Sequence, residues 1–184
     1  MKNLLRWMCV SALLGAMMTL AQAPAAKHVA VPTVSPRPED VATVDGMIRA
    51  WYDIVSGPAG KRRDWGRDRT LYIPEVRFVT VGVENGKPYS RIVDHQAFVD
   101  ASDELLLKGF FEREIYRVTE RFGPIVHVWS TYESRDTENG PVTARGINSI
   151  NLVWDGTRWW IANATWTEET KETPIPTQYL PPVK

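Results

Sequence analysis

The second half of the chain most constrains its fold, because it contains four long segments rich in β-branched and aromatic residues. Each segment is separated from the next by a glycine beside Pro, Asn or Asp, and these residue types favour tight turns. Segments joined in this way are typical of an antiparallel meander. The four predicted strands are residues 110–121, 125–134, 145–154 and 158–166.

The clearest helical pattern lies in the first half, in residues 39–56. Apolar side chains recur there at helical spacing from Val41 to Val55, and a Gly-Pro pair follows. Glu39 and Asp40 would lie at the positive end of the helix dipole. We therefore predict the first helix here.

Two further helices and a hairpin complete the first half. Residues 61–69 predict a short charged helix, and residues 94–109 predict a third helix. Between them, Asn85-Gly86 separates two apolar runs, and both residues tolerate the positive φ that a two-residue hairpin turn requires. The predicted hairpin strands are residues 76–83 and 89–93.

The order helix, helix, hairpin, helix, four strands resembles the nuclear transport factor 2-like fold, which SnoaL-like proteins share. The resemblance covers roughly residues 39–168, and its local elements look like those of exported members without an assigned activity. These elements are the Trp51-Tyr52 pair and residues 130–133, 145–149 and 155–161.

The resemblance implies an α+β fold in which a cone-shaped, curved antiparallel sheet packs on three N-terminal helices. It also implies a pocket between the sheet and the helices, and dimers that form across the outer face of the sheet. Because this fold hosts isomerases, dehydratases, hydrolases, binding proteins and structural subunits, it does not specify an activity.

The first residues have the pattern of an export signal. Lys2 and Arg6 precede an uncharged apolar run, residues 7–20, that is too short to span a bilayer. Small residues follow, and Pro24 would hinder cleavage at the most obvious site. We expect a signal peptide of residues 1–23, cut between residues 21 and 26, and a mature protein that is periplasmic or secreted, with no membrane contact.

The composition of the chain after the signal indicates three further segments. A proline-containing linker of residues 24–38 precedes the folded domain, residues 39–170, and a proline-rich tail of residues 171–184 follows it. The only cysteine, Cys9, would leave with the signal, so we expect a mature protein without thiol chemistry.

Charge and histidine spacing argue against several classes of partner. Without Lys2 and Arg6 the chain keeps 20 basic residues against 22 acidic ones, a balance that does not attract nucleic acid. The three histidines, His28, His95 and His127, are too far apart to indicate a metal site. No phosphate-cradling or dinucleotide motif is present, so no cofactor is expected.

Side-chain alternation predicts that both sheet faces are covered. In residues 126–133 and 159–166 neither face is cleanly polar, whereas a sheet with one solvated face alternates between apolar and polar residues. Strict alternation in the last strand would put Trp160 and Trp166 on one face and Trp159 and Ile161 on the other. We expect the helices on one face and a second copy of the chain, or the tail, on the other.

His127 is the one histidine within a predicted strand, so it is the candidate catalytic acid or base. The alternative, a histidine in the core or at a dimer face, is weighted more heavily. Asp94 and His95 are expected to be solvated residues at the start of the third helix. Glu112 and Glu114 alternate with arginines, a pattern typical of a solvated or edge strand.

The other candidate residues concern ligand binding rather than catalysis. Glu133 and Arg145 should lie opposite each other on neighbouring strands, where they could orient a ligand but more often form an ion pair. Asn148 in a central strand indicates a polar pocket or a hydrogen bond across the sheet. Candidate aromatic wall residues, or alternatively core residues, are Trp51, Tyr52, Tyr132 and Trp166.

Three functions fit these observations. The leading hypothesis is an exported domain that binds a small apolar or mixed-polarity molecule without catalysis. One alternative is a cofactor-independent isomerase, dehydratase or hydrolase that uses His127 or a pocket carboxylate. The other is a dimeric interaction module that uses the outer sheet face and the tail.

Overall fold

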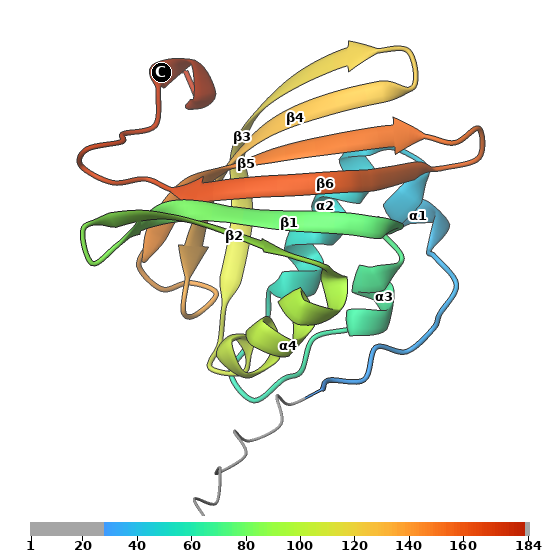
Figure 1. The fold of residues 1–184 in the computed structure, drawn as a ribbon, viewed down its shortest axis with the longest axis horizontal. Coiled ribbons are helices and arrows are strands. Elements are labelled where there is room, and N and C mark those ends of the chain that lie inside the picture. The colour runs from blue at the N-terminus through green and yellow to red at the C-terminus, as the bar shows by residue number, and fades with distance from the viewer. Residues whose placement is uncertain (1–27, 183–184) are drawn as a thin grey trace, which may run out of the picture.

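The computed structural model describes residues 28–182, and Figure 1 shows a sheet with its helices on one side. The predicted signal peptide, Cys9 and the first residues of the linker lie outside this range. Residues 28–37 contain no helix or strand, and Val29 anchors them to the helix of residues 95–106. The backbone N–H of Val29 donates to Asp100 Oδ1 at 2.8 Å, and Gln96 Nε2 donates to the Val29 carbonyl at 2.9 Å.

The first predicted helix consists of two helices. Thr43 has extended backbone angles, and its hydroxyl accepts a hydrogen bond from the Gly46 N–H at 2.9 Å, so it caps a new helix. A short α1 therefore precedes the longer α2, and α3 and α4 follow as predicted. Their bounds are α1 Pro38–Val41, α2 Val44–Val55, α3 Trp65–Arg69 and α4 His95–Leu106.

Six strands form a single sheet in the order β2-β1-β6-β5-β4-β3. The meander and the hairpin are antiparallel as predicted, and Asn85 and Gly86 both have positive φ in the hairpin turn. The strands are β1 Tyr72–Glu84, β2 Lys87–Val93, β3 Phe111–Phe122, β4 Ile125–Arg135, β5 Ala144–Trp154 and β6 Trp159–Glu168.

One pairing departs from the predicted antiparallel sheet. Strand β1 pairs with β6 in parallel, with Phe78 opposite Ala164 and Thr80 opposite Trp166. Parallel neighbours need a long connection rather than a turn, and here β2, α4 and three further strands lie between the two strands in the sequence. The sheet is therefore mixed, which local turn signals could not predict.

A second departure is a bulge in β6. Asn151 lies opposite Asn163 but Leu152 lies opposite Ile161, so Ala162 is an extra residue. The bulge shifts the alternation by one position, so the buried Trp159 and Ile161 share the inner face with Ala164. Trp166 packs against the same core. The predicted separation of Trp159 and Ile161 from Trp166 is therefore wrong.

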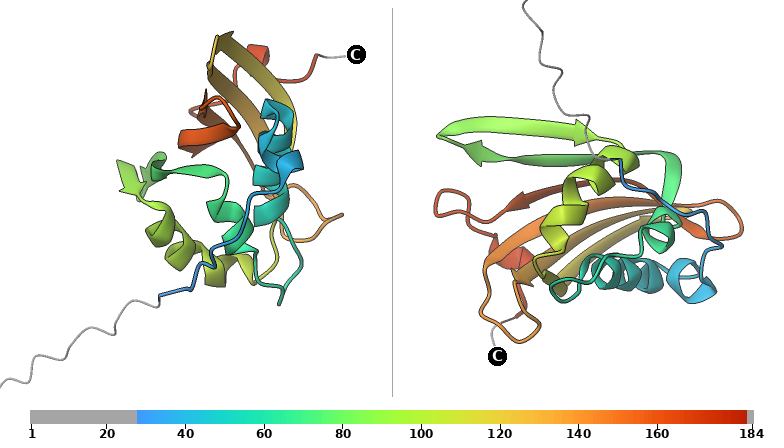
Figure 2. Two further views of the ribbon diagram at one scale, coloured as in Figure 1. Left: turned by 90° about the vertical axis from the view of Figure 1, so that its right-hand side faces the viewer. Right: turned by 90° about the horizontal axis from the view of Figure 1, so that it is seen from below.

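The core lies between α2 and the concave face of the sheet, which curves around the helices in Figure 2. From α2, Met47, Ile48 and Trp51 are buried against residues of the central strands such as Ile150 and Leu152. No helix within residues 28–182 is long and apolar enough to cross a membrane. The helices and the curved, unclosed sheet together form an α+β fold, as predicted.

The C-terminal tail contacts the convex face of the sheet. It contains one short 3-10 turn, Thr177–Tyr179. Thr131 Oγ1 in β4 donates to the Tyr179 carbonyl at 2.6 Å, and the rings of Trp129 and Tyr179 have centroids 5.4 Å apart. The tail therefore covers part of the outer face.

Candidate functional site

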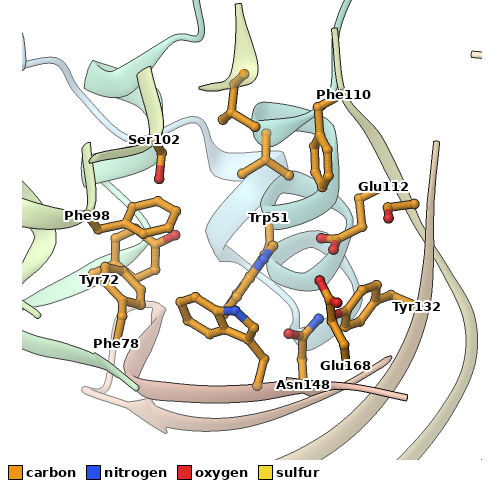
Figure 3. Close-up of a pocket in the computed structure, with 14 residues that line it drawn as sticks. Trp51, Tyr72, Phe78, Phe98, Ser102, Phe110, Glu112, Tyr132, Asn148 and Glu168 are labelled. Atoms are coloured by element: carbon orange, nitrogen blue, oxygen red, sulfur yellow. The ribbon is translucent and has the colours of Figure 1, made fainter. Parts of the chain in front are cut away.

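A cavity of about 180 Å³ lies between α2, α4 and the concave face of the sheet (Figure 3). Helix α4, the neighbouring Phe110 and five of the six strands contribute to its wall together with α2. The lining residues are Trp51, Val55, Tyr72, Phe78, Phe98, Ser102, Leu106, Phe110, Glu112, Tyr132, Ser134, Asn148, Trp166 and Glu168.

Aromatic rings form one side of this cavity and hold each other in place. The rings of Phe78 and Phe98 have centroids 4.8 Å apart, and Phe98 meets Trp166 edge to face at 6.2 Å. Tyr72 packs perpendicular to Phe78 at 5.0 Å and to Trp51 at 6.3 Å. Because edge-to-face pairs of this kind restrain ring orientation, the apolar wall is preorganised.

Two carboxyl groups share the opposite, polar end of the cavity. Figure 3 shows the side chains of Glu112 from β3 and Glu168 from β6 with their carboxyl ends turned toward each other. Neither carboxyl group has a hydrogen bond or ion pair with residues 28–182. Glu168 is exposed, so the cavity reaches solvent at this end.

Burial and the nearby charge of Glu168 raise the pKa of Glu112 to about 8. Both effects disfavour the carboxylate form, so Glu112 carries a proton at neutral pH. Burial, followed by the charges of Glu112 and Glu168, raises the pKa of Tyr132 well above its usual value. The polar end therefore presents a protonated carboxyl group and a neutral phenol at pH 7.

A chain of buried hydrogen bonds leads from the cavity wall to the far side of α2. Asn148 Nδ2 lies 3.0 Å from Tyr52 Oη, which lies 2.6 Å from Ser130 Oγ. Ser130 Oγ lies 2.5 Å from Glu114 Oε1, and Arg117 Nε and Nη2 donate to the two oxygens of Glu114 at 2.8 and 2.7 Å. The chain therefore ends on an ion pair.

The ion pair determines the direction of every bond in this chain. The Glu114 carboxylate can only accept, so the single hydroxyl proton of Ser130 points to it. Tyr52 must then donate to Ser130, and its oxygen is left to accept from Asn148. The Asn148 amide nitrogen consequently faces Tyr52, and its Oδ1, which has no partner among residues 28–182, is the acceptor left for the cavity.

His127 does not belong to this cavity. It lies on the convex face of β4, with Nε2 2.9 Å from Ser149 Oγ and Nδ1 3.4 Å from Glu120 Oε2. Its ring packs perpendicular to Trp129 with centroids 4.7 Å apart. The sheet separates His127 from the cavity, so the proposed catalytic role for His127 has no support in this geometry.

Glu133 and Arg145 lie opposite each other in the register of β4 and β5, as predicted, but their ion pairs are with other residues. Glu133 Oε1 contacts Arg113 Nε at 2.6 Å and Arg135 Nη2 at 2.5 Å. Arg145 Nη2 contacts Glu169 Oε2 at 2.6 Å. Neither Glu133 nor Arg145 lines the cavity.

Four of the predicted pocket residues do meet at the cavity: Trp51, Tyr132, Asn148 and Trp166. Tyr52 lies behind the wall, where it supports Asn148. Strand β3 is an edge strand, which is one of the two interpretations of its alternating charges. Glu112 itself is not solvated, because the bulge between Glu114 and Tyr116 and the curvature of β3 turn it inward. Nothing in the sequence around Glu168, at the end of β6, indicated that it would line a pocket.

A second buried polar cluster joins α3, β1 and α4. Asp68 is fully buried, and its two carboxylate oxygens contact His95 Nε2 at 2.8 Å and the Tyr72 hydroxyl at 3.0 Å. His95 is only 6% exposed, so the prediction of a solvated histidine is wrong, whereas Asp94 does cap α4 through the Ala97 N–H. The cluster orients the Tyr72 ring at the cavity wall.

Within residues 28–182, no three His, Cys, Asp or Glu side chains are grouped so that they could hold a metal ion. No protein-family model matches the sequence, and a search of curated proteins finds no match.

Solved structures with a similar arrangement are known. A candidate calcium/calmodulin dependent protein kinase II association domain from Xanthomonas campestris has a TM-score of 0.50 and 14% identity, covering 78% of this chain and 95% of that chain. The beta subunit of a candidate aromatic-ring-hydroxylating dioxygenase from Novosphingobium aromaticivorans has a TM-score of 0.49 and 18% identity, covering 73% and 95%.

A nuclear transport factor 2-like protein of unknown function from Silicibacter pomeroyi has a TM-score of 0.46 and 11% identity. The match covers 70% of this chain and 94% of that chain. Similarity at these identities shows the fold alone. The chain has the nuclear transport factor 2-like fold, and its function must be argued from its own site.

Proposed function

We propose that this protein binds a small, mostly apolar molecule in the cavity between α2, α4 and the sheet. The observation that carries the proposal is the preorganised aromatic wall facing a polar end with unpaired groups. A cavity of about 150 Å³ lined by apolar residues accommodates benzene. The 180 Å³ here therefore suits a molecule with one ring and a short polar substituent.

A cavity-filling variant tests this proposal. Ser102 lines the cavity from α4, whereas the adjacent Ala101 is exposed. Native mass spectrometry of the purified protein should reveal a bound small molecule, and Ser102→Leu should lose it while Ala101→Leu keeps it. Equal retention of the molecule by both variants would place it outside the cavity.

The carboxyl pair favours a second candidate function, proton transfer to or from a bound molecule. A general acid or base works best with a pKa near the operating pH, and the pKa of Glu112 is about 8. Glu112, rather than His127, is then the acid-base residue.

Deuterium exchange at carbon next to the carbonyl of small cyclic ketones, followed by NMR, tests proton transfer. The exchange catalysed by the protein should increase as pH rises through about 8 and should disappear in Glu112→Gln. His127→Gln serves as the control and should exchange as fast as the unmodified protein. Exchange that survives Glu112→Gln would contradict this role.

Exposed apolar side chains support a homodimer formed through the convex sheet face. Phe122 and Ile125, at the turn between β3 and β4, are 85% and 54% exposed, and Val83 and Ile92 of the hairpin are each 66% exposed. The two pairs lie at opposite edges of the sheet, and exposed apolar patches are typical of association surfaces. Light scattering should give the mass of a dimer, and the double variant Phe122→Asp, Ile125→Asp should give that of a monomer.

Export to the periplasm or beyond is the remaining proposal, and the charged and apolar pattern of the first 23 residues supports it. Intact-mass analysis of protein from its native host should give a mature N-terminus between residues 21 and 26. A full-length chain in the cytoplasm would contradict it.

A further inference from the structure

We infer that the ligand of the cavity is a small organic cation, an ammonium compound with N–H donors on a single ring or chain. The inference rests on the proposed binding function and specifies its ligand class. Three features of the cavity support it independently: its charge, its aromatic faces and the direction of its hydrogen-bonding groups.

The charge of the cavity wall is of one sign. Among its fourteen lining residues are two glutamates, Glu112 and Glu168, and no Lys, Arg or His. The arginines on the neighbouring strands contact other carboxylates: Arg117 contacts Glu114 and Asp45, and Arg113 contacts Glu133. The two cavity carboxyl groups therefore lack a cation within residues 28–182, and a bound ammonium group would supply it.

The aromatic wall suits the same kind of ligand. A cation over the face of Trp, Tyr or Phe is attracted by the ring quadrupole, by about 2 kcal/mol or more where water is excluded. Tyr72 and Phe98 lie across the cavity from the carboxyl groups in Figure 3, and Trp51 and Trp166 also line the cavity. An ammonium group can thus contact carboxylate oxygens while its carbon atoms pack on rings.

The third feature is the excess of hydrogen-bond acceptors. Asn148 is only 4% exposed, and the chain through Tyr52, Ser130 and Glu114 directs its amide nitrogen away from the cavity. Its Oδ1 therefore adds an acceptor to those of Glu168, and Glu112 becomes a further acceptor when it ionises. Every fully buried side-chain nitrogen and oxygen atom among residues 28–182 has a hydrogen-bond partner, so these acceptors are open to the cavity. An ammonium group with three N–H donors would satisfy them.

Ionisation of Glu112 couples ligand binding to pH. Three side chains interact electrostatically with Glu112: Glu168 from β6, Tyr132 from β4 and Tyr52 from α2. A second hollow, lined mainly by α2 and β3, also contains Glu112. Its other charged residues are Arg49, Asp53, Arg113, Glu114, Arg117, Arg135 and Glu138. A cation favours the carboxylate form of Glu112, so its affinity should increase as pH rises toward 8.5.

Calorimetric titration with three probes of nearly equal shape tests the inference: benzylamine, benzyl alcohol and benzoate. At pH 8.5 benzylamine remains largely protonated, as the ammonium group of lysine does. We expect it to bind at least about tenfold more tightly than benzyl alcohol, a difference of about 1.4 kcal/mol. Benzoate should not bind, and benzylamine should bind several-fold more weakly at pH 6.5.

Matched variants locate the binding. Glu112→Gln preserves the shape of the side chain and should weaken benzylamine at pH 8.5 by at least about tenfold, with little effect on benzyl alcohol. Glu120→Gln, on the exposed convex face of the same strand, is the control and should bind like the unmodified protein.

The possible failures are distinguishable. Benzyl alcohol or benzoate binding as tightly as benzylamine would overturn the cation inference and leave the cavity proposal intact. If none of the three probes bound to the unmodified protein, both the inference and the proposed binding function would be overturned.

Discussion

Glu112 shows how one inward-facing carboxyl group makes the stability of the folded protein depend on pH. Its folded pKa of about 8 lies above the ordinary value of 4.5, so between these values the folded state holds a proton that the unfolded state releases. Stability from this group is therefore complete at low pH and is lost as pH rises through 8. The expected loss is about 1.4 kcal/mol of unfolding free energy per pH unit.

Urea unfolding between pH 5 and 9 tests this dependence. Glu112→Gln should remove most of the slope and should be more stable than the unmodified protein at pH 9, because the glutamine never ionises. Glu120→Gln should leave the slope unchanged. A slope that persists in Glu112→Gln would mean that another group binds the proton.

Ser130 is the middle member of the chain that directs Asn148. It is fully buried between Tyr52 and Glu114, so Ser130→Ala leaves the buried Tyr52 hydroxyl and the half-buried Glu114 carboxylate each short of a partner. The expected loss of unfolding free energy is about 1–3 kcal/mol. Ser149→Ala, on the convex face of the next strand, should cost less than about 1 kcal/mol in the same urea titration.

At the scale of elements, the start of α2 depends on one hydroxyl group. Thr43 Oγ1 accepts from the Gly46 N–H, and no other side chain within residues 28–182 caps this helix end. Thr43→Ala should therefore lower the unfolding free energy by about 1 kcal/mol, whereas Thr43→Ser keeps the acceptor and should be nearly neutral. Equal effects of the two substitutions in thermal unfolding would assign the loss to the methyl group instead.

Elements with local signals could be predicted from the sequence. The Asn85-Gly86 turn requires two positive φ angles, and the structure has φ of 52° and 73° there. The apolar period of α2 and the glycine-containing turns of the meander are equally local. The parallel β1–β6 pairing and the bulge at Ala162 depend on contacts between distant segments, and the sequence carries no local trace of them.

The candidate site could be predicted only in part, for the same reason. Trp51, Tyr132, Asn148 and Trp166 have residue types that suggest a pocket wall on their own. Glu112 and Glu168 resemble surface residues, because they lie among other charged residues in the sequence. They meet only because β3 and β6 curve around the same cavity, which is a property of the whole sheet.

At the scale of the whole molecule, the tail stabilises the sheet that it crosses. Ile175 is buried, and Tyr179 contacts Trp129 and Thr131. Deletion of residues 175–184 should lower the Tm by several degrees and speed hydrogen exchange in β4, because β4 loses this cover. Deletion of residues 181–184 alone keeps these contacts and should change neither quantity; a matching loss there would contradict this role.

The parallel ladder between β1 and β6 also determines the order in which the protein can fold. Its partners Phe78 and Ala164 are far apart along the chain, so β1 has no neighbour on that side until nearly the whole polypeptide has been synthesised. Closing so long a loop is slow, and the contacts that reward it form last. The hairpin and α2 can form early, but the cavity, which needs β1 and β6 together, is completed only with the final strand.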